Sequence, residues 1–262
     1  MRSLNIGATG MLAQQTNVDV ISNNIANMNT TAYTKRRAEI NDLVYQNYIR
    51  PGATSTSSQT IVPSGIQLGT GVRTAAVYRI TEGGGVTKTD NTLDLAIQGR
   101  GYFQIELPEG KGIAYTRDGA FQRNGDGVIV THDGYIVQPE ITIPEDAVEI
   151  YVNNSGEVWV KQDGETDEIN VGQLELATFT NEAGLEAIGN NMFTETQASG
   201  APILDNPDTE GFGSILQGYL SASNVNPVSE ITELVSAQRA YEMNSKIIQT
   251  SDQMLSTINQ MK

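Results

Sequence analysis

The sequence predicts an α+β protein in which two long terminal helices form a coiled-coil core and a β-rich domain occupies the middle. Hydrophobic residues recur every seven residues near both ends of the chain, which indicates helices. Short β-branched runs separated by turn residues fill the middle. Residues 51–226 hold eight basic and 24 acidic residues, whereas both ends are close to neutral. We therefore expect the ends to be buried in protein and the middle to face water.

The N-terminal core helix is predicted over residues 1–29. Its seven-residue repeat consists of Leu4, Met11, Val18 and Ile25, joined late in the segment by Ile21. Gly7 and Gly10 each disfavour the helix by about 1 kcal/mol relative to alanine. Small residues at 7–10 would also let another helix approach closely. This helix is therefore expected to depend on packing for its stability.

The C-terminal core helix is predicted over residues 226–262. It begins at Asn226-Pro227, an N-cap donor followed by proline at the first helical position. Its repeat consists of Leu234, Tyr241, Ile248 and Leu255, flanked at the same spacing by Ala240, Ile247, Met254 and Met261. Polar residues interrupt both repeats, so two interpretations stay open. The helices either cap a globular core or order only when they pack against copies of the chain.

Between the helices we expect a connecting segment over 30–75 and a β-rich outer domain over 76–225. Runs rich in β-branched and aromatic residues predict strands at 72–80, 93–97, 102–107, 128–131, 135–137, 148–152, 157–160 and 171–179. Residues 51–65 are polar and of low complexity, which alone is typical of a flexible loop.

The sequence contains no recognisable catalytic, cofactor-binding or metal-ligating constellation. It has no cysteine and one histidine, His132, which lies in a turn, so thiolate and multi-histidine metal sites are excluded. Its Asp/Gly turns fail the EF-hand spacing, and no phosphate-loop or dinucleotide fingerprint is present. Carboxylate pairs such as Asp167-Glu168 leave one enzymatic alternative, a secreted carbohydrate-active β protein.

Charge and hydropathy limit the partners and the compartment. The net charge of −15 argues against nucleic acid, and Lys35-Arg36-Arg37 is too small a basic cluster to bind it. No run approaches about 18 apolar residues, so direct membrane insertion is not expected. The N-terminal residues lack the apolar region of a cleaved signal peptide, and these rules alone predict a cytoplasmic protein.

Four separated motifs carry a family resemblance. They are QQTNVDVISNNIAN at 14–27, IQGRGYF at 97–103 with YTRDGAF at 115–121, QGYL at 217–220 with SNVN at 223–226, and QRAYEMNSK at 238–246. The chain resembles, over essentially its whole length, the bacterial flagellar axial proteins, specifically the basal-body rod family. Two positions depart from the family pattern: Ala32 replaces a usual glycine, and Ser221 replaces a frequent acidic residue.

Within that family the chain is most similar to distal rod subunits. DLVYQ at 42–46, RPGA at 50–53, PSG at 63–65 and GTGV at 69–72 carry this similarity. The resemblance implies a non-enzymatic subunit, without cofactors, of a hollow helical drive shaft that transmits torque and lines the export channel. It also implies that 46–65 is an extended, hairpin-like arm that stiffens the tube. Proximal rod and hook subunits are the alternatives inside the family.

The resemblance implies partners and contact residues as well. The partners are other copies of the chain, the proximal rod protein, the hook protein, the P- and L-ring proteins and the type III export apparatus. Localisation is then the periplasm-spanning rod, reached by export without a cleaved signal peptide. Expected subunit-interface residues are Leu4, Met11, Val18, Ile21, Asn24, Ile25, Asn27, Leu234, Tyr241, Ile248, Leu255 and Ile258. Expected arm contacts are Tyr45, Tyr48, Arg50, Pro51 and Pro63.

Overall fold

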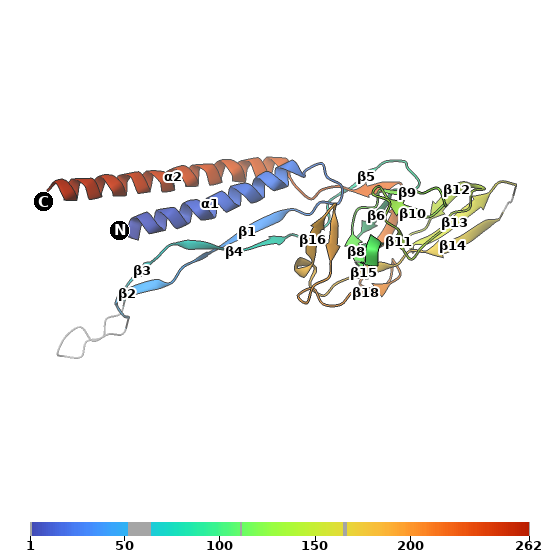
Figure 1. The fold of residues 1–262 in the computed structure, drawn as a ribbon, viewed down its shortest axis with the longest axis horizontal. Coiled ribbons are helices and arrows are strands. Elements are labelled where there is room, and N and C mark those ends of the chain that lie inside the picture. The colour runs from blue at the N-terminus through green and yellow to red at the C-terminus, as the bar shows by residue number, and fades with distance from the viewer. Residues whose placement is uncertain (1, 52–63, 111, 165–166, 262) are drawn as a thin grey trace. The chain divides into compact units, whose positions relative to one another are not determined.

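The computed structural model describes residues 2–51, 64–110, 112–164 and 167–261. It confirms an α+β protein with an N-terminal helix, a C-terminal helix and a β-rich middle (Figure 1). The chain divides into two compact units. The helical unit comprises residues 1–26, 36–79 and 226–262, and the β unit comprises 27–35 and 80–225.

The helical unit contains the two helices and two pairs of strands. Helix α1 spans Arg2–Ala26 and helix α2 spans Pro227–Gln260. Strand β1 (Arg36–Asp42) pairs antiparallel with β4 (Val72–Arg79), and β2 (Tyr45–Ile49) pairs antiparallel with β3 (Ile66–Gly69). Helix α1 contacts α2 on one side and β1 and β4 on another. The Asn226 side chain accepts hydrogen bonds from the amides of Val228 and Ser229, which fixes the start of α2 as the Asn-Pro signal predicts.

Helices α1 and α2 run antiparallel and meet through small and polar residues. Ser251 Oγ donates to Ser3 Oγ at 3.0 Å near one end. A Cβ atom on Gly7 would lie 2.9 Å from Ile248 Cγ1, and one on Gly10 would lie 2.8 Å from Asn244 Nδ2. The two glycines therefore permit the close approach of α2. The intramolecular contact runs one position away from the predicted repeat of Leu4, Met11, Val18 and Ile25.

The β unit is built on an antiparallel sheet in the order β16-β17-β8-β7-β15-β18, with β11 also paired to β7. A second sheet has the order β12-β13-β14, and the pairs β9-β10, β6-β19 and β5-β20 complete the unit. The strands are β5 Val86–Lys88, β6 Leu95–Gln98, β7 Tyr102–Glu106, β8 Ile113–Thr116, β9 Phe121–Arg123, β10 Ile129–Thr131, β11 Val137–Gln138, β12 Ala147–Val152, β13 Glu157–Gln162, β14 Glu168–Gln173, β15 Leu176–Thr178, β16 Glu186–Gly189, β17 Met192–Thr194, β18 Ile203–Asp205, β19 Ser214–Gln217 and β20 Tyr219–Ser221. Short 3-10 helices occur at Pro108–Gly110 and Glu182–Gly184.

The β unit has an apolar core with two aromatic clusters. Phe103 and Phe121 meet edge to face with ring centroids 5.0 Å apart, and both are fully buried. Tyr115 and Phe179 make a second such pair at 4.8 Å. Burial, followed by the charge of Glu195, raises the pKa of the Tyr115 phenol above its ordinary value. The prediction of one strand over 171–179 is wrong. Strand β14 ends at Gln173, before Leu174, and β15 begins at Leu176, after it, and the two strands belong to different sheets.

Ala32, which replaces a usual family glycine, lies in the left-handed region with φ of 55°. Its amide donates to the carbonyl of Ser221 at 2.8 Å, and this bond holds it there. Because a Cβ atom disfavours this conformation by about 1–2 kcal/mol, we expect Ala32→Gly to stabilise the β unit by about 1 kcal/mol.

Urea denaturation checks this expectation. Ala201→Gly, at an exposed loop position without positive φ, is the matched control and is expected to destabilise slightly. An Ala32→Gly variant no more stable than the control would contradict the argument from backbone strain.

Candidate assembly surfaces

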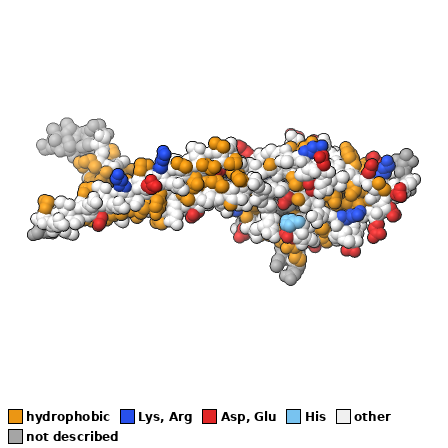
Figure 2. Space-filling model, turned by 90° about the horizontal axis from the view of Figure 1, so that it is seen from above, with side chains coloured by type: hydrophobic (Ala, Val, Ile, Leu, Met, Phe, Trp, Pro, Cys, Tyr) orange, Lys and Arg blue, Asp and Glu red, His pale blue; other side chains and the backbone are white. Residues whose placement is uncertain are grey.

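Helix α2 carries large apolar side chains that none of the described residues of the helical unit covers. Val228 is 75 % exposed and Met243 is 61 % exposed. The other exposed members are Ile231, Val235, Tyr241, Ile247, Met254, Ile258 and Met261. Figure 2 shows hydrophobic side chains gathered over the helical unit. Large apolar side chains left exposed in this number indicate an interaction site in a soluble protein.

The β2–β3 strand pair is a second exposed apolar surface. Tyr45, Tyr48, Ile49, Ile66 and Leu68 are all exposed on it. A two-stranded pair has little stability of its own in water. Arg2 anchors it from α1, with its guanidinium carbon 4.7 Å from the Tyr48 ring centroid. A hydrogen bond to Asp42, followed by the charge of that carboxylate, raises the pKa of Tyr45.

The predicted interface residues differ in exposure. Ile21 and Asn24 are buried. Tyr241 and Ile258 are exposed, and the remaining predicted interface residues are half-buried: Leu4, Met11, Val18, Ile25, Asn27, Leu234, Ile248 and Leu255. Among the expected arm contacts, Tyr45, Tyr48, Arg50 and Pro51 are exposed, and Pro63 lies outside the described residues. The seven-residue repeats did not single out the exposed Leu12, Val228 and Met243; only a full account of burial identifies them.

Asn24 joins three elements of the helical unit at one buried point. Its Nδ2 donates to the carbonyl oxygen of Arg36 at 2.8 Å and to Glu230 Oε2 at 3.0 Å. Its Oδ1 accepts from the amide of Arg36 at 2.9 Å. Asn24 and Glu230 are only 2 % and 4 % exposed. One side chain therefore ties α1 to the first turn of α2 and to the start of β1.

The two units differ in net charge. The helical unit has nine basic and seven acidic residues, whereas the β unit has seven basic and 24 acidic residues. Figure 2 shows many of these acidic side chains over the β unit. The apolar surfaces therefore lie on the nearly neutral unit, where electrostatic repulsion between copies is weakest.

Comparison with known sequences identifies the family. The sequence model described as "Flagella basal body rod protein" matches residues 4–34, and "Flagellar hook protein FlgE/F/G D1 domain" matches 96–160. "Flagellar basal body rod FlgEFG protein C-terminal" matches 216–261. The "Flagellar basal-body rod protein FlgG" of Caulobacter vibrioides is 57 % identical over 262 residues, the whole of both chains. The chain belongs to the flagellar basal-body rod protein family.

Two further relatives indicate which member of the rod family this chain is similar to. The FlgG rod protein of Agrobacterium fabrum is 50 % identical over 99 % of this chain and 98 % of its own. That of Bacillus subtilis is 38 % identical over 100 % of this chain and 99 % of its own. These matches confirm the prediction of a structural, distal rod subunit over the proximal rod and hook alternatives. They also overturn the alternative of a carbohydrate-active enzyme.

Asn224, in the rod-family motif SNVN, makes hydrogen bonds to three backbone groups of the β unit. Asn224 Oδ1 accepts from the amide of Lys35 at 2.6 Å, while its Nδ2 donates to the carbonyls of Ile80 at 3.0 Å and Glu82 at 2.8 Å. Gln217, in QGYL, has a similar role, because Nε2 donates to Thr92 and Ile150 carbonyls and Oε1 accepts from Val152. These amides hold chain segments that are far apart in sequence.

The central rod-family motifs are structural too. Arg117 is buried, donates to the carbonyl of Gly99 and lies 5.7 Å from the Tyr102 ring centroid. Arg100 Nε donates to Glu182 Oε1 at 2.9 Å. Both arginines thus donate hydrogen bonds to acceptors inside the β unit, the Gly99 carbonyl and the Glu182 carboxylate.

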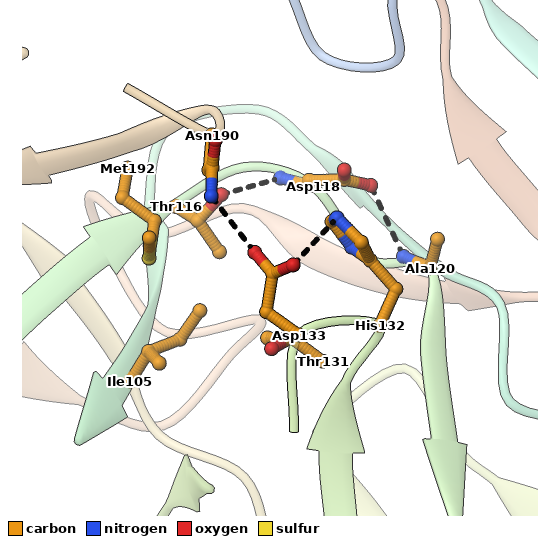
Figure 3. A pocket seen from close by; sticks show the side chains of 9 residues that line it. All are labelled: Ile105, Thr116, Asp118, Ala120, Thr131, His132, Asp133, Asn190 and Met192. Carbon is orange, nitrogen blue, oxygen red and sulfur yellow. Dashed lines mark hydrogen bonds and ion pairs between the residues drawn. The ribbon is translucent and has the colours of Figure 1, made fainter. Parts of the chain in front are cut away.

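The pocket beside His132 does not have the features of a reaction centre (Figure 3). His132 Nε2 lies 3.5 Å from Asp133 Oδ1, and Asn190 Nδ2 donates to Asp133 Oδ2 at 3.0 Å. The cavity measures about 10 Å³, which is room for about one water molecule. Among the described residues, no group of three acidic or histidine side chains could hold a metal ion. Within the same residues, neither helix combines the length and apolarity needed to cross a bilayer.

Proposed function

We propose that the chain polymerises helically through its helical unit into a hollow, rigid distal rod that transmits torque from motor to hook. The exposed apolar faces of α2 and of the β2–β3 pair carry this proposal. Both faces would lower the solubility of a monomer, and both lie on the nearly neutral helical unit. Heterologous contacts that do not close into a ring generate an open helical assembly.

In the assembled rod, α1 and α2 form a coiled-coil inner layer that lines the export channel. This assigns residues 1–29 and 226–262 to the core, 30–75 to the connecting segment with its arm, and 76–225 to the outer domain. The antiparallel helix pair and the repeats of Leu234, Tyr241, Ile248 and Leu255 support this arrangement. The β2–β3 pair gives the arm its contact residues and bridges neighbouring subunits, which stiffens the tube.

The partners follow from that position. They are other copies of the chain, the proximal rod protein at one end, the hook protein at the other, and the P- and L-ring proteins around the outer domain. The type III export apparatus delivers the subunit without a cleaved signal peptide, and the rod spans the periplasm. The acidic β unit keeps the outer surface of the rod soluble.

A charge on the exposed face of α2 tests the proposal. We expect Met243→Lys to abolish motility and rods in cells, and to raise the critical concentration for polymerisation in vitro at least tenfold. Burial of one methionine side chain is worth about 1.5–3 kcal/mol, and each 1.4 kcal/mol is tenfold in affinity. Electron microscopy of basal bodies and sedimentation of purified protein measure these effects.

The matched control is Val148→Lys, which places the same charge at an apolar residue of the β unit that is 65 % exposed. It is expected to leave rods intact. Circular dichroism of both monomers separates lost assembly from lost folding. Normal rods and motility in the Met243→Lys strain would refute the proposed role of this face.

A further inference from the structure

The two helices leave a groove between them that is empty in the part of the helical unit that the structure describes. It is lined by Gln15, Val18, Gln238, Tyr241 and Glu242, and its volume is about 400 Å³. That volume is within the range of roughly 300–1,000 Å³ found for pockets that bind drug-sized ligands. Val18 and the Tyr241 ring supply apolar surface, and the amides and the carboxylate supply polar groups.

The last turns of α2 extend past the end of α1 (Figure 1). Ser3, near the start of α1, is hydrogen bonded to Ser251, but α2 continues to Gln260. We call Met254, Ile258 and Met261 the α2 tip; all three are more than half exposed, with Met261 at 81 %. Nine residues of α2 follow Ser251, which corresponds to about 14 Å of helix.

The character of the contact face of α2 changes where α1 ends. Along the face that α1 covers, Ala237, Asn244 and Ser251 recur every seven residues and are small or polar. The next position in that series is Ile258, which is apolar and 51 % exposed. An apolar residue at the first uncovered position indicates that this part of the face has a different occupant.

We propose that the α2 tip of one subunit inserts into the groove between α1 and α2 of a second copy. The inference rests on the proposed polymerisation and names one of its contacts. Tyr241 and Ile258 lie on one continuous helix, about 26 Å apart along its axis, so a subunit cannot place its own tip in its own groove. The contact joins two different surfaces of the chain, and in its head-to-tail form, which we propose here, it extends a polymer without limit. No acidic side chain follows Asp252 in α2, so the tip does not repel Glu242 at the groove.

The absence of native cysteine makes disulfide cross-linking a direct test. The variant Val18→Cys/Ile258→Cys is assembled under reducing conditions and oxidised only afterwards, so that the bond does not influence polymerisation. We expect a ladder of covalent oligomers on a non-reducing gel. The two single variants are expected to remain monomeric on the same gel. Leu12→Cys/Ile258→Cys is the matched control, because Leu12 is an exposed residue of α1 outside the groove.

A second variant covers the possibility that cysteine in the groove prevents assembly. Ile258→Ser leaves the groove intact and is expected to raise the critical concentration about tenfold. Polymers that give no ladder, a ladder of equal strength from the Leu12 control, or a critical concentration unchanged by Ile258→Ser would each overturn the contact while leaving the proposed function standing. Failure of the parent chain to polymerise at all would instead overturn the proposed function.

Discussion

Replacing Asn24 with aspartate is expected to disrupt the helical unit and to abolish rods. The new carboxylate would lie about 3 Å from Glu230 Oε2 at a site where both residues are almost fully buried. It would also lose the Nδ2 donor to the carbonyl of Arg36. Removing one partner of a buried charged contact typically costs about 3–5 kcal/mol, and a like charge adds repulsion. We therefore expect at least that loss of stability.

The measurement is amide hydrogen exchange of α1, α2 and the Arg36 amide in purified protein, together with rod counts in cells. Asn5→Asp makes the same chemical change at an exposed position of α1 and near the positive end of the helix dipole, so it is expected to be harmless. Adding Glu230→Gln to Asn24→Asp removes the like-charge contact and is expected to restore part of the protection. Unchanged exchange in Asn24→Asp would contradict the expected cost of placing a second carboxylate at this buried junction.

The features that follow from local signals were predictable from the sequence. The start of α2 is determined by two neighbouring residues. The Asn226 side chain accepts hydrogen bonds from amides in the first turn, and Pro227 has no amide hydrogen that would be left without a partner there. Strand β4 was predicted over 72–80 and is found at Val72–Arg79, because β-branched and aromatic residues are frequent in this short stretch. Such signals depend on neighbours in the chain, so periodicity and turn residues are sufficient to find them.

The face by which α1 meets α2 was not predictable in the same way. Apolar periodicity selects Leu4, Met11 and Val18, but the structure uses the preceding positions, with Ser3 and Gly10 among them. The small residues at 7–10 predicted that another helix could approach closely, as α2 does. They give no hydrophobic signal that selects the contact face, and that face depends on which residues of α2 approach it. The repeat of apolar residues stays a prediction for contacts between subunits.

The order of the strands in the sheets could not be predicted from the sequence either. The apolar run at 171–179 predicts extended structure but does not say which strands are its partners. The chain in fact leaves β14 of one sheet and enters β15, beside β7 and β18 of another, and the Leu174 amide donates to the carbonyl of Gly156 between them. Pairings across long stretches of sequence are determined by the assembled core rather than by any local pattern.

Gly119→Ala is expected to destabilise the β unit by about 3–5 kcal/mol, which is at the upper end for a single substitution. Gly119 is buried, and a Cβ atom at this position would overlap the carbonyl oxygen of Leu95, which is backbone and cannot rotate away. The collision would break the hydrogen bond of 3.0 Å from the Leu95 amide to the Gly119 carbonyl. It would also displace Phe121, whose ring packs against Phe103 in the core.

Urea denaturation followed by near-ultraviolet circular dichroism measures this loss, since the aromatic clusters lie in the β unit. The matched control is Gly125→Ala, also a glycine next to an aspartate, where no atom lies within 4 Å of an added Cβ and φ is not positive. The control is expected to change stability by less than about 0.5 kcal/mol, or to raise it slightly by restricting the unfolded chain. Because the two variants add the same methyl group, their difference isolates the contact with the Leu95 carbonyl. Equal midpoints for the two would mean that the backbone around Gly119 can move aside at little cost, and that the rod-family motif YTRDGAF does not need glycine for steric reasons.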